Sequence, residues 1–136
     1  MKKSLIATIV ILLIVVIGGY FIFDGIFPKA NPIQYPKIDD INSISLEQND
    51  DILISIETKG FEELLHHIAN AKPTRKMSVN DYPTVRTYYK VAIDTTEREY
   101  RYYVYIEDGY VHIETPYEGI YKSDQQFYDL IEQYNK

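Results

Sequence analysis

The sequence predicts an α+β protein: an N-terminal transmembrane helix followed by a small antiparallel sheet with two helices packed on one face. Three observations predict this class. The chain begins with a long uncharged apolar run, continues through segments whose apolar residues recur at every second position, and contains two segments with apolar residues at helical spacing. Consecutive period-two segments indicate antiparallel pairing, and two amphipathic helices need a sheet face against which to bury their apolar stripes.

The apolar run Leu5–Phe23 has 19 consecutive positions without a charge. As a helix rising 1.5 Å per residue it reaches about 28 Å, roughly the hydrocarbon thickness of a bilayer. A cleaved secretory signal is the alternative, but such signals have a shorter apolar stretch and an Ala-x-Ala type of cleavage site, which Ala30 does not provide. We therefore expect residues 1–27 to be a cytoplasmic stub and retained anchor that contacts the lipid bilayer through residues 5–23.

The charges beside the run predict its orientation. Lys2 and Lys3 stand immediately before it, whereas Asp24 follows it, with Lys29 as the nearest positive charge on that side. Because positive flanks favour the cytoplasmic side, we expect a single-pass protein of the cell membrane with its N-terminus inside and its C-terminal domain outside.

Three prolines follow the run at regular spacing, at positions 28, 32 and 36. Proline fixes φ and removes a backbone donor, so the segment should be extended and stiff. The sequence thus predicts a stalk over residues 28–37 and one extracytoplasmic domain over residues 38–136.

Composition restricts the function classes. The chain has a net charge of −6 and no cysteine. The part beyond Lys2 and Lys3 holds 12 Lys+Arg against 20 Asp+Glu, a net charge of −8. An acidic domain repels nucleic acid, so no nucleic-acid partner is expected. An exported domain without disulfides suits a Gram-positive bacterial envelope.

The period-two segments of the domain predict the strands. They are 41–47, 52–57, 84–94, 100–106, 111–116 and a short edge strand at 119–122. Asp108-Gly109 is a strong hairpin signal. The buried sheet face should consist of Tyr89, Val91, Val104, Ile106, Val111 and Ile113.

The helical stripes are Phe61, Leu64, Leu65 and Ile68 in the first helix, and Phe127, Leu130, Ile131 and Tyr134 in the second. Ser123 followed by Gln126 resembles a capping box before the second helix. The predicted order is β-β-α-β-β-β-(β)-α.

Two blocks carry a resemblance to a known family. Residues 70–83 (NAKPTRKMSVNDYP) and 103–124 (YVYIEDGYVHIETPYEGIYKSD) resemble an uncharacterised family, a domain of unknown function in exported or membrane-anchored proteins from low-GC Gram-positive bacteria. The resemblance covers roughly residues 38–134. It implies a location in the bacterial envelope and brings no activity and no site residues.

Tyrosine is the most distinctive residue type of the domain. Ten of the 14 tyrosines lie between Tyr82 and Tyr121. Tyr88, Tyr103 and Tyr105 alternate with the apolar set of their strands, so we expect them on the outer sheet face, where rigid amphipathic rings suit recognition of a partner. The plainer alternative is that tyrosine has high strand propensity and covers the sheet by cross-strand pairing.

A basic group, Lys72, Arg75 and Lys76, stands in a loop of the otherwise acidic domain. Such a group can bind phosphate, a wall polymer or anionic headgroups, or it can simply be a solvated loop that balances local acidity.

The sequence contains no recognised enzyme signature. A hydrolase using carboxylates from Glu107, Asp108, Glu114 or Glu118 is the alternative hypothesis, although the choice of a pair is arbitrary. The adjacent His66 and His67 lack the spacing of a helical metal site, so neither metal nor cofactor is expected. The function expected is binding, not catalysis, with an envelope protein, a peptide or toxin, or a wall polymer as partner, in sensing, immunity or an accessory role.

Overall fold

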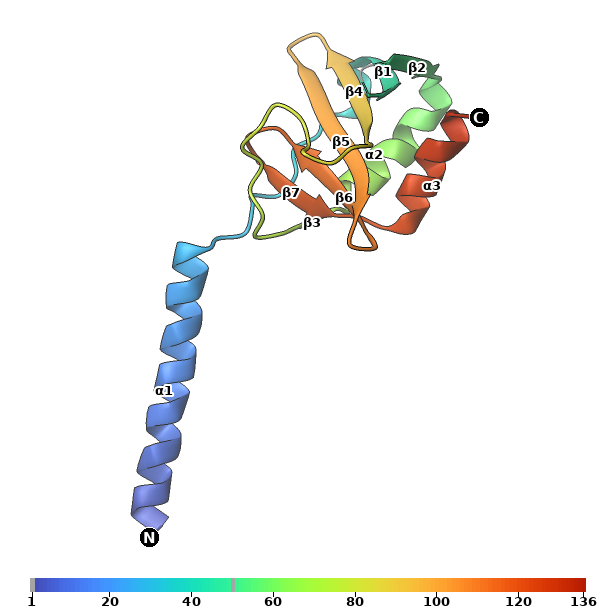
Figure 1. Ribbon diagram of the computed structural model, residues 1–136. Coiled ribbons are helices and arrows are strands. Elements are labelled where there is room, and N and C mark those ends of the chain that lie inside the picture. Colours follow the sequence, from blue (N-terminus) through green and yellow to red (C-terminus); the bar gives the residue numbers. More distant parts are fainter. Residues whose placement is uncertain (1, 50) are drawn as a thin grey trace.

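The computed structural model describes residues 2–49 and 51–136 (Figure 1). Its elements are α1 (Lys2–Ile26), β1 (Ile41–Gln48), β2 (Asp51–Ile56), α2 (Phe61–Ala69), β3 (Lys72–Pro73), β4 (Tyr89–Thr95), β5 (Glu99–Glu107), β6 (Tyr110–Thr115), β7 (Gly119–Lys122) and α3 (Gln125–Tyr134). Short 3-10 turns at Ile38–Asp40 and Thr58–Gly60 precede β1 and α2. The α+β class is confirmed, with β3 as a strand that the periodicity did not predict.

The N-terminal helix α1 extends away from the rest of the protein (Figure 1). Compared with the predicted run Leu5–Phe23, the helix extends about one turn further at each end, from Lys2 to Ile26. None of its residues is buried. By length and composition it is able to cross a membrane, a test that a signal sequence near an N-terminus also passes.

The seven strands form one antiparallel sheet in the order β2-β1-β4-β5-β6-β7-β3. The turn between β5 and β6 is the one that the sequence predicted. Asp108 has φ 53° and Gly109 has φ 78°, so both central residues take the left-handed conformation that a type I′ hairpin turn requires. The predicted edge strand at 119–122 is instead an inner strand, because β3 pairs with its outer side.

Helices α2 and α3 lie on one face of the sheet (Figure 1). Their predicted stripes are buried at Phe61, Leu65, Phe127 and Ile131, against Val91, Val104 and Ile113 of the central strands, among others. The prediction was wrong for Ile106, which lies at the second-last position of β5 and is 44% exposed, although its cross-strand partner Val111 is buried.

The cap of α3 also differs from the prediction. The backbone N–H of Phe127 donates to the Asp124 carboxylate at 2.9 Å, so Asp124 is the N-cap in place of Ser123. A carboxylate at this position additionally interacts favourably with the helix dipole.

The strand predicted from Thr84 begins only at Tyr89, and residues 74–88 form a loop. This covering loop runs from β3 at one edge of the sheet back to the inner strand β4, between β1 and β5. It passes over the face that the helices leave free (Figure 1). Ser78 and Pro83 of the covering loop are buried, so it is packed against the sheet.

The interpretation of residues 28–37 as a stalk requires a correction. Ala30 and Ile33 are buried members of the hydrophobic core. Gly119 of β7 makes room for the segment, because a Cβ there would lie 2.5 Å from the Ala30 Cβ. The segment is therefore packed as part of the domain, since its apolar side chains have partners that a free stalk would lack.

Candidate functional site

The outer-face tyrosines are the first candidate. Tyr103 and Tyr105 lie on the face opposite the helices, as expected, but they are only 5% and 3% exposed. Tyr88 belongs to the covering loop, and its ring meets that of Tyr103 edge-on at 5.3 Å between centroids. The expectation of an exposed tyrosine surface was wrong, because the covering loop lies over it.

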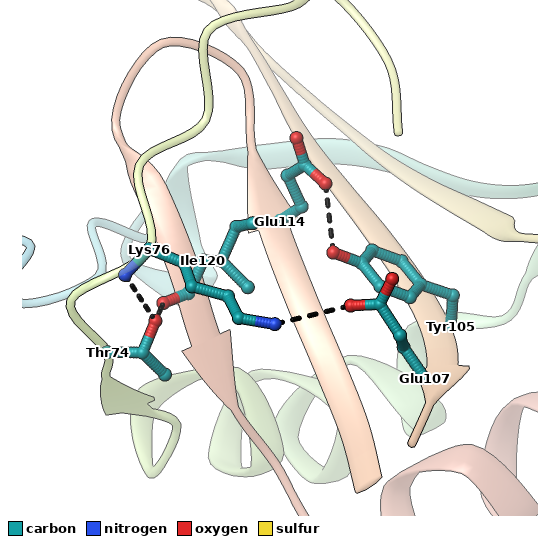
Figure 2. A network of polar contacts seen from close by, with 6 residues as sticks. All are labelled: Thr74, Lys76, Tyr105, Glu107, Glu114 and Ile120. Carbon is teal, nitrogen blue, oxygen red and sulfur yellow. Dashed lines mark hydrogen bonds and ion pairs between the residues drawn. The ribbon is translucent and has the colours of Figure 1, made fainter. Parts of the chain in front are cut away.

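A buried polar network fastens the covering loop to this face. The Ser78 hydroxyl donates to Glu114 Oε1 at 2.7 Å, and the Tyr105 hydroxyl donates to Glu114 Oε2 at 3.0 Å, the second bond being drawn in Figure 2. Burial and the neighbouring Glu114 charge raise the pKa of Tyr105, which keeps its hydroxyl protonated as a donor. The network joins the loop, β5 and β6.

His112 adjoins this network. Its ring stacks on that of Tyr105 at 5.6 Å between centroids. Its Nδ1 is buried and has no hydrogen-bond partner in the part of the chain that the structure describes. Burial, followed by the charge of Lys76, lowers the pKa of His112, so the neutral ring is favoured. Within residues 2–49 and 51–136 no group of three or more His, Cys, Asp or Glu residues is placed to hold a metal ion.

The three residues of the predicted basic group lie in different surroundings and do not form one site. Lys72 is an exposed residue of β3. Lys76 extends over the outer face, where its Nζ lies 3.4 Å from Glu107 Oε2 (Figure 2). The backbone beside it is fixed as well, because the Thr74 hydroxyl donates to the Ile120 carbonyl at 2.6 Å and accepts from the Lys76 N–H at 3.1 Å.

Arg75 contacts the end of α1. Its Nη2 lies 2.7 Å from the Asp24 carboxylate, its Nη1 donates to the Phe27 carbonyl, and its guanidinium stands 5.1 Å above the centre of the Phe23 ring. A cation at a helix C-terminus also interacts favourably with the helix dipole. Arg75 therefore connects the covering loop to the apolar helix, and periodicity had no means of predicting this contact.

A pocket of about 230 Å³ opens beside the start of β5. It lies between residues 28–37, which we call the linker, the covering loop, β5 and the turn from β6 to β7. Its lining residues are Gln34, Asp81, Arg98, Glu99, Tyr100, Arg101, Tyr102, Thr115, Pro116, Tyr117 and Glu118. We call it the arginine pocket. None of these residues except Glu118 stood among the candidates from the sequence, because they come from four separate segments.

The polar groups of the arginine pocket hold one another in place. The Arg98 guanidinium stacks 4.0 Å from the Tyr100 ring centre and donates to the Gln34 side chain at 3.1 Å. Hydrogen bonds from Arg101 to Glu99 at 2.6 Å and from Tyr117 to Asp81 at 2.9 Å brace its walls. Guanidinium, carboxylate and phenol groups in a concave site suit recognition of a polar group of a partner.

The carboxylates of the alternative hydrolase hypothesis are dispersed among these features. Glu114 accepts the two buried hydrogen bonds described above, and Glu107 lies near Lys76. Asp108 is in the hairpin turn, and Glu118 lines the arginine pocket. Glu107 and Glu114 therefore have structural partners.

Comparisons with known proteins address the family and the fold. Residues 29–122 match the family DUF5301, described as "Domain of unknown function (DUF5300)". A solved structure described as the NMR structure of the protein from Ruminococcus gnavus is similar, with 26% sequence identity and a TM-score of 0.58, over 71% of this chain and 99% of that chain. Among curated proteins, none matches the chain.

Proposed function

This chain belongs to the DUF5301 family, and we propose that it is a single-pass membrane protein whose extracytoplasmic domain works by binding a partner in the cell envelope. The observation that carries the anchor is α1, an apolar helix of 25 residues without a buried position. A helix that is apolar on all sides and exposed to water would be costly, so a bilayer is its natural surrounding.

The contacts of Arg75 support retention of the helix. The domain supplies a cation to Asp24 of α1 and to the carbonyl of Phe27, which directly follows the helix, and cleavage of a signal sequence would remove the Asp24 contact. With Ala30 buried, only two residues separate Phe27 from the first buried position, so the domain would sit directly on the membrane surface. Lys2 and Lys3 favour an N-terminus inside the cell.

The arginine pocket supports binding as the task of the domain. It is concave, and its polar groups are already oriented by their mutual contacts, which lowers the entropic cost of binding. An envelope protein, a peptide or a wall polymer with a hydroxyl-rich polar group is the kind of partner that it would accept.

Topology is tested most directly with single cysteines, because the chain has none of its own. We would introduce Glu97→Cys in the turn from β4 to β5, and Ser4→Cys before the apolar run. A membrane-impermeant maleimide should label Glu97→Cys in intact cells and Ser4→Cys only after permeabilisation. The reverse pattern contradicts the orientation, and a domain released into the medium with a new N-terminus near Asn31 contradicts the retained anchor.

Binding is tested by crosslinking the full chain to envelope components in its native membrane. Arg98→Ser should abolish a crosslinked species that the wild type forms, because it removes the guanidinium from the arginine pocket. Arg86→Ser, an exposed arginine of the covering loop outside this pocket, is the matched control and should keep it. Equal crosslinking by both variants would exclude the pocket.

A further inference from the structure

The two edges of the sheet differ in how they are protected. At one edge, β3 has only two residues, and Pro73 provides no N–H for pairing. Beyond it, the Thr74 N–H donates to the Ile120 carbonyl at 3.1 Å and the Ala30 N–H donates to the Thr74 carbonyl at 2.9 Å. This edge is thus short, interrupted by proline and covered by the linker.

The opposite edge is the strand β2. It has six residues and pairs with β1 on one side only, and no strand of the described ranges 2–49 and 51–136 pairs with its outer side. Natural proteins protect such edges with proline, lysine, a β-bulge or a very short strand. The pairing of β2 with β1 shifts its register between Leu46 and Glu47, opposite the middle of β2, so the regular part of the edge is the half that contains Ile54 and Ile56. The sequence of β2, Asp-Ile-Leu-Ile-Ser-Ile, has neither proline nor lysine, and its one charge is at the first position.

A pocket of about 250 Å³ adjoins this open edge. Ile54 and Ile56 form one side of it, and Tyr134 of α3 and Gly60 form the other. Ile54 is 38% exposed although it pairs with the fully buried Leu46, so an apolar side chain on the core side of the sheet is left partly uncovered. The Tyr134 ring lies against Gly60, where a Cβ would come within 2.5 Å of the Tyr134 hydroxyl.

The charges around this edge indicate which kind of partner it would bind. Asp51, Glu57 and Glu63 surround the strand and Tyr134, and Lys59 is already paired with Glu57 at 2.7 Å. The surroundings are therefore net negative, as is the whole extracytoplasmic part. A second copy of this chain would bring the same acidic groups to the contact, whereas a basic segment would be attracted.

We propose that β2 binds an extended basic segment of a partner protein by strand addition, with one of its alternate apolar side chains in the pocket between Ile54 and Tyr134. Main-chain hydrogen bonds along the edge provide the affinity, and the pocket and the acidic surroundings provide the specificity. The site is separate from the arginine pocket and does not depend on the orientation of α1.

The test uses the full chain in detergent micelles and a short synthetic peptide in which lysine and valine alternate, with blocked ends. Two versions are methylated on the backbone nitrogen, one at every lysine and the other at every valine. Because successive residues of a strand direct their N–H groups to opposite edges, pairing with one edge predicts that one methylated version binds and the other does not. Amide hydrogen exchange should slow in residues 51–57.

Variants of the protein locate the site. Ile54→Lys should weaken peptide binding by at least about tenfold, since it places a positive charge at the open edge and over the pocket. Glu97→Lys is the matched control for added positive charge, and Arg98→Ser is the control for the arginine pocket; both should bind as the wild type does. Circular dichroism and thermal unfolding verify that each variant is folded.

Several outcomes would overturn the proposal: no saturable binding of the unmethylated peptide, equal binding of the two methylated versions, or unchanged binding by Ile54→Lys. Association of two copies through β2 in the absence of peptide would overturn it in favour of a homodimer. A reversed labelling pattern of the two cysteine variants, or equal crosslinking by Arg98→Ser and Arg86→Ser, would instead contradict the proposed function and leave this result unaffected.

Discussion

One face of the sheet is covered by α2 and α3 through aliphatic and aromatic side chains, whereas the other is covered by residues 74–88 through hydroxyl, carboxylate and aromatic groups. On the helix face Leu64, Val104 and Ile131 are completely buried and need no specific partner atom. On the loop face Ser78 and Tyr105 meet a single carboxylate, Glu114. The first face depends on area removed from water and the second on particular hydrogen bonds.

This difference has a consequence for dynamics. Short amphipathic helices packed on a sheet are removed from it only by loss of the core, but a loop held by a few polar groups can open locally. The helix face should therefore open only with global unfolding. The loop face should open at a lower free energy than the helix face, and the two opening free energies are measurable by amide hydrogen exchange.

The largest effect is expected on the helix face. Ile131→Ala removes a fully buried side chain of α3 and leaves a cavity, which should lower the free energy of unfolding by about 2–5 kcal/mol. Denaturant unfolding of the full chain in micelles measures it. Leu65→Ala, on α2, should lie in the same range, and a cost below about 0.5 kcal/mol for both variants would show that the helices do not hold this face.

The helix face is also the part that the sequence could predict. Period two placed Val91, Val104 and Ile113 on one side, and helical spacing assigned Phe127 and Ile131 to face them, because these patterns arise from local geometry that repeats along each element. The error among the predicted sheet residues of this face, Ile106, lies near a strand end, where periodicity continues but does not determine whether a side chain is covered.

The loop face was beyond such prediction. The apolar alternation after Thr84 predicts a strand, but the chain must cross from β3 to β4, and residues 84–88 are part of that crossing. The burial of Tyr103 follows from that crossing. Ser78 and Glu114 are 36 positions apart, and no local pattern couples them. The arginine pocket has the same origin, since four distant segments build it.

The second prediction removes the acceptor on which the loop face depends. Glu114→Leu leaves the hydroxyls of Ser78 and Tyr105 without their acceptor, and it should cost about 1–3 kcal/mol, with faster amide exchange in residues 74–88. The exposed Glu118→Leu is the matched control and should cost less than about 0.5 kcal/mol. Equal costs would show that the buried hydrogen bonds do not fasten the loop.

The third prediction concerns pH. Burial, then Lys76 and Lys122, lower the pKa of His112 in the folded protein, against Glu107 and a backbone contact with Tyr110 that raise it. The unfolded chain therefore binds the proton more readily, and the stability should fall as the pH decreases below about 6.5.

Unfolding curves at pH 7.5 and at successively lower pH check this dependence on His112. A His112→Gln variant should flatten the dependence, and His66→Gln, which changes an exposed histidine, should retain it. A wild-type dependence in His112→Gln would assign the effect to other titrating groups, the carboxylates or His67 beside Asp124.

The smallest effect on stability is expected at Arg75, where the covering loop meets α1. Arg75→Ala removes an ion pair with a half-exposed Asp24 and a cation–π contact with Phe23, interactions that are each worth about 1 kcal/mol or less. Because neither is part of the sheet, the unfolding midpoint of the domain should hardly change. The domain should, however, gain rotational freedom relative to α1, visible as shorter ¹⁵N rotational correlation times for the domain of the full chain in lipid nanodiscs. The control variant Lys72→Ala, on the neighbouring β3, should have the same correlation times as the wild type. Unchanged correlation times in Arg75→Ala would show that Arg75 is not needed and that the linker packing around Ala30 holds the domain to the helix.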